Sequence, residues 1–270
     1  MVNAYMTQPK LRIAEVTMKF RTRRGAEVVA VDDLSLDVMD REFISIVGPS
    51  GCGKSTLLRV VAGLVEPTSG AVYLDGRQVD APGADRGMVF QSYTLFPWLT
   101  VLGNVQFGSR INGLPAAERE RLAREYLEMV GLKGFEGHYP KELSGGMMQR
   151  VAIARALAND PEVLLMDEPF GALDAQTRII MQELLVNLWQ RTPKTILFVT
   201  HDIDEALFLS ERVYIMTARP GRIKQVLAVD LPRPRSLDLL TAPTFVAMKR
   251  TVLASIKEEG LKAINVISNA

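Results

Sequence analysis

Small residues followed by Lys-Ser-Thr form the segment GPSGCGKST at residues 48–56. The segment fits the pattern G-x-x-x-x-G-K-[ST] at Gly48, Gly53, Lys54 and Ser55. Glycines let backbone N–H groups close around phosphate oxygens, and a helix start adds the positive end of its dipole. Lys54 would bridge the β- and γ-phosphates, and the Ser55 hydroxyl would ligate Mg²⁺. The other members of this predicted phosphate cradle are Pro49, Ser50, Gly51, Cys52 and Thr56.

A second group of reactive side chains ends the segment VLLMDEP at residues 163–169. An apolar run that ends in two acids is expected for a buried parallel strand that delivers polar groups at its carboxyl end. Beside a bound nucleotide, Asp167 would hold Mg²⁺ directly or through water. Glu168 would orient or deprotonate the attacking water. A solvated acidic pair is the alternative, which the nearby cradle motif disfavours.

Together the two motifs predict a nucleoside triphosphatase, a property that several classes of protein share. A GTPase usually carries N-K-x-D to recognise guanine, and this sequence contains none. A protein kinase would need H-R-D and D-F-G, which are also absent. A glycine-rich turn without a ligand is the remaining alternative, and the Lys-Ser pair at its end disfavours it.

Alternating strand and helix patterns surround the motifs and predict an α/β protein. The expected strands occupy residues 11–20, 28–38, 43–47, 71–74, 87–90, 163–166, 196–200 and 213–216. The expected helices among them occupy residues 54–62, 175–191 and 204–209. The strand at 43–47 leads directly into the cradle, as the motif requires.

The middle of the chain has a different pattern, mainly helical from about residue 92 to residue 160. Residues 116–130 carry charges on one side and apolar residues on the other, and Gly131 is a plausible stop. Another helix fits residues 145–159, so a helical insert interrupts the α/β core. Beyond the helix-breaking LPRP at 231–234, residues 245–259 favour an amphipathic helix that packs on the body.

The composition is that of a soluble globular protein, with 270 residues, of which 47% are apolar and 23% charged. The balance of 32 basic and 31 acidic residues gives no global basic excess that would favour nucleic acid. No apolar run approaches the about 18–20 residues that cross a bilayer, and the N-terminus lacks the apolar stretch of a signal peptide. The single cysteine, Cys52, permits no intramolecular disulfide and indicates a reducing compartment. We interpret Cys52 as a small packing residue, with a redox role as the alternative.

Residues 143–150, LSGGMMQR, resemble the signature motif of ABC-type ATPases. Ser144, Gly145 and Gly146 are expected to open a helix, which would form a second anion-binding helix start. One cradle and one separate phosphate-capping turn suggest a head-to-tail pair of chains that buries two ATP molecules. The resemblance implies this dimer. A helix N-cap without a ligand is the alternative.

Further segments match the family in order along the chain. Gln91 in MVFQ resembles the Q-loop glutamine, which contacts Mg²⁺ and water in the family. Residues 171–174, GALD, resemble the D-loop, which makes Asp174 a candidate nucleotide-binding residue. His201 in FVTHD resembles the switch histidine that contacts the γ-phosphate. Phe20 occupies the place of the aromatic residue that stacks on adenine, with a core aromatic as the alternative.

The resemblance implies a P-loop NTPase of the ABC type, with an N-terminal antiparallel β part and an inserted α-helical subdomain. The ATPase domain would span residues 1–235. It would comprise a RecA-like core at about 1–91 and 160–230 and a helical subdomain at about 92–159. Residues 236–270 would form a C-terminal helical tail.

The family pattern also implies the ligands, ATP and Mg²⁺, and a role for each candidate residue. The metal would be held by Ser55, Gln91 and Asp167. The catalytic residues would be Glu168, His201 and Gln91. His138 has no motif around it, so we expect it to be structural.

The sequence departs from the family pattern at a few positions. Met147 and Met148 stand where members often carry glutamine, and Met147 cannot donate a hydrogen bond to the partner's nucleotide. Gly171 stands where many members have serine. Phe20 replaces the commoner tyrosine, which keeps stacking and loses a hydroxyl.

Four segments, LFPWLTVLGNVQFG, DEPFGALD, TARPGRI and VDLPRPR, together resemble the nitrate/sulfonate/taurine group of importers. The resemblance implies a separate ATP-binding subunit that lies peripherally on the cytoplasmic face of the inner (plasma) membrane. Its solute would be a small anion such as nitrate, a sulfonate, taurine or bicarbonate, selected by an extracytoplasmic solute-binding protein. Transmembrane permease subunits would dock near residues 91–98. The candidate lining residues are Tyr93, Leu95, Phe96, Pro97 and Trp98, with internal packing as the alternative for most of them.

Two other functions compete with this interpretation. A soluble ABC ATPase acting on ribosomes or DNA would usually carry two ATPase units or a long coiled coil, and neither pattern is present. A scaffold that binds ATP without hydrolysing it would not need Lys54, Asp167, Glu168 and His201 together. We therefore expect an ATPase coupled to transport, with no nucleic acid as partner.

Overall fold

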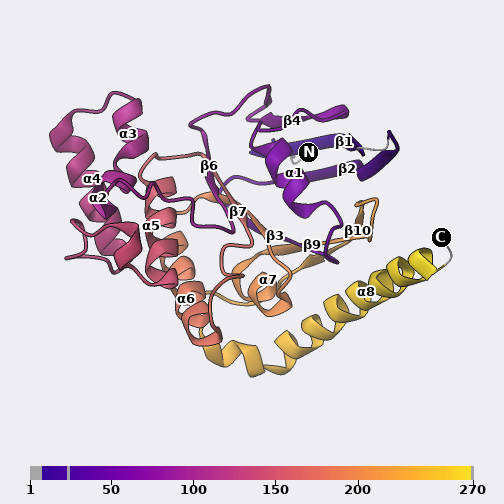
Figure 1. The fold of residues 1–270 in the computed structure, drawn as a ribbon. Helices are drawn as coiled ribbons and strands as arrows, with labels where there is room; N and C mark the ends of the chain where they lie inside the picture. The colour runs from indigo at the N-terminus through magenta and orange to yellow at the C-terminus, as the bar shows by residue number, and fades with distance from the viewer. Residues whose placement is uncertain (1–7, 23–24, 269–270) are drawn as a thin grey trace, which may run out of the picture. The chain divides into compact units, whose positions relative to one another are not determined.

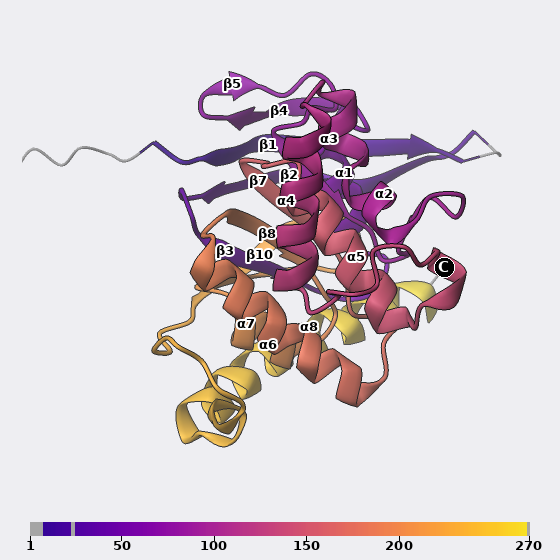
Figure 2. The same ribbon diagram turned by 90° about the vertical axis from the view of Figure 1, so that its left-hand side faces the viewer.

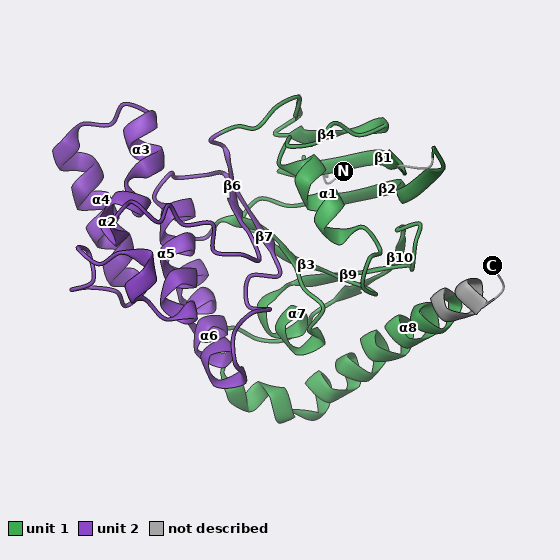
Figure 3. Cartoon of the chain, viewed as in Figure 1, with its two compact units in different colours: residues 1–83, 194–270 green, residues 84–193 purple. Residues whose placement is uncertain are grey.

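The computed structural model describes residues 8–22 and 25–268 of the chain (Figure 1). The chain divides into two compact units, one formed by residues 1–83 and 194–270 and the other by residues 84–193 (Figure 3). Within the described ranges, no helix combines the length and apolar character needed to cross a membrane.

The first unit begins with an antiparallel sheet of strands β1 (Leu11–Arg21), β2 (Glu27–Val38), β4 (Ser69–Leu74) and β5 (Arg77–Gln78). Their order is β2-β1-β4-β5, and the strands are visible together in Figure 2. In β1 the side chains of Leu11, Ile13, Val16 and Met18 are buried, and the residues between them, mostly polar, are more exposed. This alternation is what buries one face of a strand and leaves the other in water.

The same unit holds a second group of strands, β3 (Phe43–Val47), β8 (Thr195–Val199), β9 (Arg212–Met216) and β10 (Ile223–Ala228). β3 pairs in parallel with both β8 and β9, and β10 pairs antiparallel with β9. All five residues of β3 and of β8 are buried, because parallel strands are covered on both faces. The rings of Phe43 and Phe198 pack 5.8 Å apart in this core.

The helices of the first unit are α1 (Lys54–Val61), α7 (Ile203–Leu209) and α8 (Pro243–Ser268), with a short 3₁₀ turn at Leu237–Thr241. Phe245, Val252 and Glu259 are buried on α8 at intervals of seven residues, so one face of this helix packs against the unit. The neighbours of that face include α7 and β9. The tail therefore packs as the sequence predicts, although the helix continues to Ser268 instead of ending at residue 259.

The second unit contains two parallel strands, β6 (Arg86–Val89) and β7 (Val163–Asp167). Between them in sequence lie the helices α2 (Val101–Val105), α3 (Phe107–Ile111), α4 (Ala116–Met129) and α5 (Gly145–Leu157). A 3₁₀ turn at Pro140–Glu142 precedes α5, and α6 (Ala175–Arg191) follows β7. Gly131 follows the end of α4 with a φ of 69°, the left-handed conformation typical of a helix stop.

The predicted α/β class, antiparallel N-terminal part and helical insert are thus confirmed. The sequence did not indicate β5 or β10. β10 is half-exposed along most of its length, so its residues lack the apolar pattern of a buried strand.

Candidate functional site

The predicted phosphate cradle is a tight loop between β3 and α1 in the first unit. Gly53 has a φ of 103°, and a Cβ atom there would lie 2.7 Å from the carbonyl oxygen of Ala30. A larger residue would therefore clash with β2 as well as strain the backbone. Gly51, with a φ of 74°, gives the loop a second left-handed position. The glycine spacing follows from this geometry.

Lys54 lies at the centre of the cradle and is only 6% exposed. Its ammonium donates hydrogen bonds to the carbonyl oxygens of Gly48, at 2.9 Å, and Pro49, at 3.1 Å. Two main-chain carbonyls thus hold a positive charge inside the loop, where a triphosphate would be received. Ser55 and Thr56 occupy the first turn of α1, half-buried, so the chemistry of the cradle fits an ATP phosphate chain.

Cys52 is buried within the same loop. Burial raises the pKa of its thiol above the ordinary value, although the neighbouring Lys54 works in the opposite direction. The reactive thiolate is therefore disfavoured. This supports the interpretation of Cys52 as a packing residue.

His201 follows β8, where a hydrogen-bonded turn holds the chain. The Thr200 hydroxyl donates to Glu205 at 2.7 Å, and Asp202 caps α7 by accepting from the backbone N–H groups of Asp204 and Glu205. His201 itself is exposed at the carboxyl end of the strand, the edge at which parallel α/β sheets bind ligands. Phe20 on β1 is 44% exposed, so it is not part of the core.

In the second unit, β7 delivers the two predicted acidic residues. Asp167 is its last residue and is buried, and Glu168 follows with a φ of 43°. A left-handed conformation is uncommon for a residue other than glycine and marks a position that the surrounding structure constrains. The backbone N–H of Gly171 donates to the Glu168 carbonyl at 3.0 Å and closes the turn.

Gln91 and Glu168 meet at Gly171 within this unit. A Cβ atom at Gly171 would lie 3.4 Å from the Glu168 carbonyl oxygen and 3.6 Å from Gln91 Nε2. The structure therefore brings together two residues that are far apart in the sequence. These distances are ordinary van der Waals contacts, so the space would admit a Cβ atom at Gly171.

The signature segment opens α5. Ser144 is the N-cap, and its side chain accepts a hydrogen bond from the Met147 N–H at 3.3 Å. A Cβ atom at Gly145 would lie 2.7 Å from Tyr93 Oη, and one at Gly146 would lie 2.6 Å from Thr177 Cγ2. A larger residue at either position would therefore displace the neighbouring side chain of Tyr93 or Thr177.

Thr177 links the signature segment to the predicted D-loop. It packs beside Gly146, and its backbone N–H and hydroxyl donate to the carboxylate of Asp174 at 2.9 and 2.6 Å. These hydrogen bonds lower the pKa of Asp174, which caps α6. Asp174 is therefore an ionised N-cap. Thr177, which donates to it, packs beside Gly146 at the start of α5.

Residues 93–98, which hold the candidate lining residues of the predicted docking segment at 91–98, are only partly exposed. Trp98 is 71% exposed, whereas the half-buried Phe96 packs against Trp98, Phe107 and the guanidinium of Arg155. Tyr93 and Leu95 are also half-buried, and Pro97 is exposed. Trp98 is thus the largest side chain of the group that is free to contact another molecule.

Asn104, which belongs to none of the predicted motifs, organises this segment. Its buried amide accepts from the Phe96 N–H and donates to the carbonyls of Phe96, Leu99 and Thr100. No local pattern marks such a residue. His138 is structural as expected, with its carbonyl accepting from Val101 N–H at 2.7 Å and its ring packed on Phe135.

The candidate Mg²⁺ ligands are a hydroxyl, an amide oxygen and a carboxylate. Ser55 belongs to the first unit, and Gln91 and Asp167 belong to the second. In the part of the chain that the structure describes, no three or more His, Cys, Asp or Glu side chains form a metal site of their own. Mg²⁺ usually binds through one or two carboxylates together with substrate phosphates and water. Hard oxygen ligands that act with a nucleotide therefore fit this ion.

Comparison with known proteins defines the class to which this cradle and signature helix belong. The family model described as "ABC transporter" matches residues 31–171. The chain belongs to the ABC transporter family, as an ATP-binding subunit whose ATPase activity is coupled to transmembrane transport.

The names of similar proteins are more specific than the family description. The chain is 54% identical to the uncharacterized ABC transporter ATP-binding protein MJ0412 of Methanocaldococcus jannaschii, over 94% of each chain. It is 54% identical to the nitrate import ATP-binding protein NrtD of Synechocystis sp., over 82% of this chain and 83% of the relative. It is 50% identical to the taurine import ATP-binding protein TauB of Rhizobium johnstonii, over 83% and 85%.

A solved structure confirms the fold and shows a related assembly. The ATP-binding cassette MJ0796, in a dimeric post-hydrolysis state bound to ADP and phosphate, matches with a TM-score of 0.72 and 35% identity. The match covers 82% of this chain and all of that one. The predicted ABC-type fold is therefore confirmed.

Proposed function

We propose that this chain hydrolyses ATP to energise an importer of a small anion such as nitrate, taurine, another sulfonate or bicarbonate. The observation that carries the proposal is identity of 50–54% to a nitrate and a taurine import ATP-binding protein over more than four-fifths of the chain. Neither relative supports action on ribosomes or DNA. The choice among these anions lies with other subunits, because the chain itself binds nucleotide.

The proposed roles within the ATP site follow the geometry of each unit. Lys54 and the backbone of residues 48–56 bind the phosphates, and Phe20 stacks on adenine. Ser55, Gln91 and Asp167 hold Mg²⁺, which neutralises charge on the phosphates when it is bound. Glu168 holds the attacking water and accepts its proton, and His201 donates to the γ-phosphate. The constrained turn that joins Glu168 to Gly171 and Gln91 supports these roles.

The proposed working unit is a head-to-tail pair of chains. Each ATP would lie between the cradle of one copy and residues 144–146 of the other, with Asp174 nearby. The dimeric cassette of 35% identity supports the pairing of two copies. The pair would lie on the cytoplasmic face of the plasma membrane and contact permease subunits through Trp98 and its neighbours, with a solute-binding protein acting on the other side.

The test is co-purification of the tagged Glu168→Gln protein from native membranes, followed by mass spectrometry. We expect a multi-span membrane subunit and an extracytoplasmic binding protein. The binding protein would then be titrated with nitrate, taurine, an alkanesulfonate and bicarbonate. Trp98→Ala in the same background is the matched variant and should reduce recovery of the membrane subunit. Recovery of ribosomal or DNA-associated proteins alone would contradict the transport function.

A further inference from the structure

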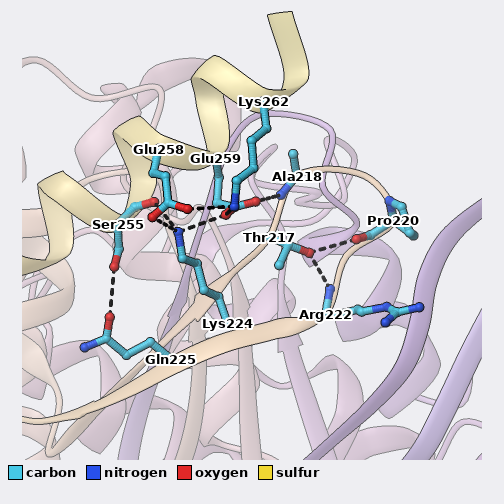
Figure 4. Close-up of polar contacts among 10 residues, drawn as sticks. All are labelled: Thr217, Ala218, Pro220, Arg222, Lys224, Gln225, Ser255, Glu258, Glu259 and Lys262. Atoms are coloured by element: carbon cyan, nitrogen blue, oxygen red, sulfur yellow. Dashed lines mark hydrogen bonds and ion pairs between the residues drawn. The ribbon is translucent and has the colours of Figure 1, made fainter. Parts of the chain in front are cut away.

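The connection between β9 and β10, residues 217–222, forms a self-contained loop, here called the β9–β10 loop. The Thr217 hydroxyl donates to the Pro220 carbonyl at 2.8 Å and accepts from the Arg222 N–H at 2.9 Å (Figure 4). The Thr217 N–H also donates to the Arg222 carbonyl at 2.9 Å. These three hydrogen bonds hold the backbone of the loop in one shape. A displacement of one side of the loop would therefore also displace the other side.

One side of the β9–β10 loop contacts the phosphate cradle at two points. The guanidinium of Arg219 donates to the Gly51 carbonyl, at 3.0 Å from Nη2 and 3.3 Å from Nε. Gly221 passes so close that a Cβ atom there would lie 2.1 Å from the Cys52 carbonyl oxygen. The cradle thus rests directly on this loop.

β2 fixes the position of Gly221. The Gly221 N–H donates to the Ala30 carbonyl at 3.0 Å, and the Asp32 N–H donates to the Gly221 carbonyl at 3.0 Å. Arg222 pairs with the Asp32 carboxylate. The loop is therefore anchored to the sheet on the same side as the cradle.

The other side of the β9–β10 loop is held by α8. The Ala218 N–H donates to Glu259 Oε2 at 3.2 Å. Glu259 Oε1 accepts from Lys224 of β10 at 2.8 Å and from Lys262 at 2.9 Å, while the neighbouring Glu258 pairs with the same two lysines (Figure 4). The long C-terminal helix thus contacts the residue next to Arg219.

Glu259 is suited to a permanent anchor. It is 3% exposed, and burial by itself would raise the pKa of its carboxyl. Hydrogen bonds from Lys224, Lys262 and the Ala218 N–H outweigh burial and lower the pKa to about 2. Glu259 is therefore a carboxylate at any physiological pH, and a charged acceptor makes the stronger hydrogen bond to Ala218.

The cradle, the β9–β10 loop and α8 also line a common hollow of about 660 Å³. Its wall includes Gly51 of the cradle, Arg219 of the loop, and Glu259 and Lys262 of α8. The three elements therefore meet in one place, although they lie far apart in the sequence.

We propose that Arg219 is a positioning residue for the phosphate cradle, and that Glu259 of α8 holds the loop that presents it. The Gly51 carbonyl and the Cys52 N–H belong to one planar peptide. Arg219 holds the carbonyl oxygen and the Pro49 carbonyl accepts from the Cys52 N–H at 3.3 Å, so both ends of this peptide are held. Arg219 thereby sets the cradle in its ATP-binding form before ATP arrives. The C-terminal helix is part of the nucleotide site through this contact. The inference rests on the proposed role of residues 48–56.

The test compares ATP hydrolysis and the affinity for a fluorescent ADP analogue in the full-length protein. Arg219→Ala and Glu259→Ala should each raise KM for ATP and weaken ADP binding by about threefold to tenfold, the effect of one hydrogen bond, with kcat within about twofold. The double variant should raise KM by a factor smaller than the product of the two single-variant factors, because both changes act through one chain of contacts. Arg219 is exposed, so its truncation should leave the protein folded.

Glu258→Ala is the matched control. It removes the same charge from the same helix turn and pairs with the same lysines, but it leaves the Glu259 bond to Ala218 in place. Its KM should stay within about 1.5-fold of the unchanged protein. Unchanged KM in Arg219→Ala, or equal effects of Glu258→Ala and Glu259→Ala, would overturn the inference. Lys54→Ala distinguishes failure of this inference from failure of the proposed function. If Lys54→Ala binds ADP normally, residues 48–56 are not the nucleotide site.

Discussion

At the scale of one residue, the ammonium of Lys54 is held in place by the main chain before any ligand is bound. Its ammonium is buried and held by the carbonyls of Gly48 and Pro49. These neutral acceptors offset only part of the cost of burying a charge. A triphosphate would supply the opposite charge, so the residue gains most when nucleotide is bound. Gly53, in a left-handed conformation against Ala30, keeps the loop narrow enough for this contact.

Lys54→Ala should therefore weaken ATP binding by about tenfold to a hundredfold and abolish most turnover, since charge-assisted hydrogen bonds of about 1.5–3 kcal/mol are lost. Calorimetric titration with ATP measures the affinity, and a phosphate-release assay measures turnover. Arg59→Ala, an exposed cation in the last turn of the same helix, is the control and should change neither. Near-normal hydrolysis by Lys54→Ala would refute the cradle assignment.

At the scale of elements, the segment after β10 caps the C-terminal end of α7. Helix ends leave carbonyl groups without intrahelical partners. Arg235 donates to the carbonyls of Phe208, at 3.0 Å, and Ser210, at 2.8 Å, and Arg233 donates to that of Leu209 at 2.6 Å. Burial lowers the pKa of Arg235 to about 10, so it remains a cation at neutral pH. The LPRPR sequence is thus a helix cap supplied from outside the helix.

Arg235→Met should lower the free energy of unfolding by about 2 kcal/mol, because buried carbonyls at the end of α7 lose their donors. The loss is moderated since a buried charge is removed at the same time. Urea unfolding followed by circular dichroism measures the change. Arg250→Met, at an exposed position on α8, is the control and should stay within about 0.5 kcal/mol. A variant at Arg235 as stable as this control would contradict the capping role.

At the scale of the whole molecule, the chemical groups are divided between two compact units. The cradle, His201 and Phe20 belong to the first, whereas Gln91, Asp167, Glu168 and Ser144 belong to the second. The proposed site residues thus come from both units, and the proposed head-to-tail pairing would add residues 144–146 of a second copy. A dimeric relative of 35% identity supports such an assembly.

Glu168→Gln should preserve ATP binding, lower hydrolysis by at least about a hundredfold and trap an ATP-bound dimer, because the amide cannot accept the proton of the attacking water. Size-exclusion chromatography with light scattering, with and without ATP and Mg²⁺, measures the mass. Glu118→Gln, an exposed acid on α4, is the control and should hydrolyse ATP normally. A monomer at saturating ATP would count against the head-to-tail model.

Elements with strong local patterns were predicted well from the sequence. The expected strand at residues 43–47 and helix at 175–191 match β3 and α6. The buried strand is continuously apolar, and the helix starts at Asp174, a good N-cap. α8 was predicted too short: Gly260, a residue that often ends helices, follows Glu259, yet the helix continues through it to Ser268. β10 was missed because antiparallel pairing with β9, rather than an apolar pattern in its own residues, makes this segment a strand.

The sequence by itself indicated the chemistry that depends on close spacing, since Gly48, Gly53, Lys54 and Ser55 lie within one short segment. Close approach of the backbone requires the glycines, whereas the charge of Lys54 and the hydroxyl of Ser55 carry the predicted chemistry. The tertiary structure decided the contacts between distant segments. Arg219 and Gly51 are 168 residues apart, and Glu259 and Ala218 are 41 residues apart. Such pairs leave no periodic pattern, because their positions depend on how sheets and helices pack. The link from α8 through the β9–β10 loop to Gly51 therefore became visible only in the folded chain.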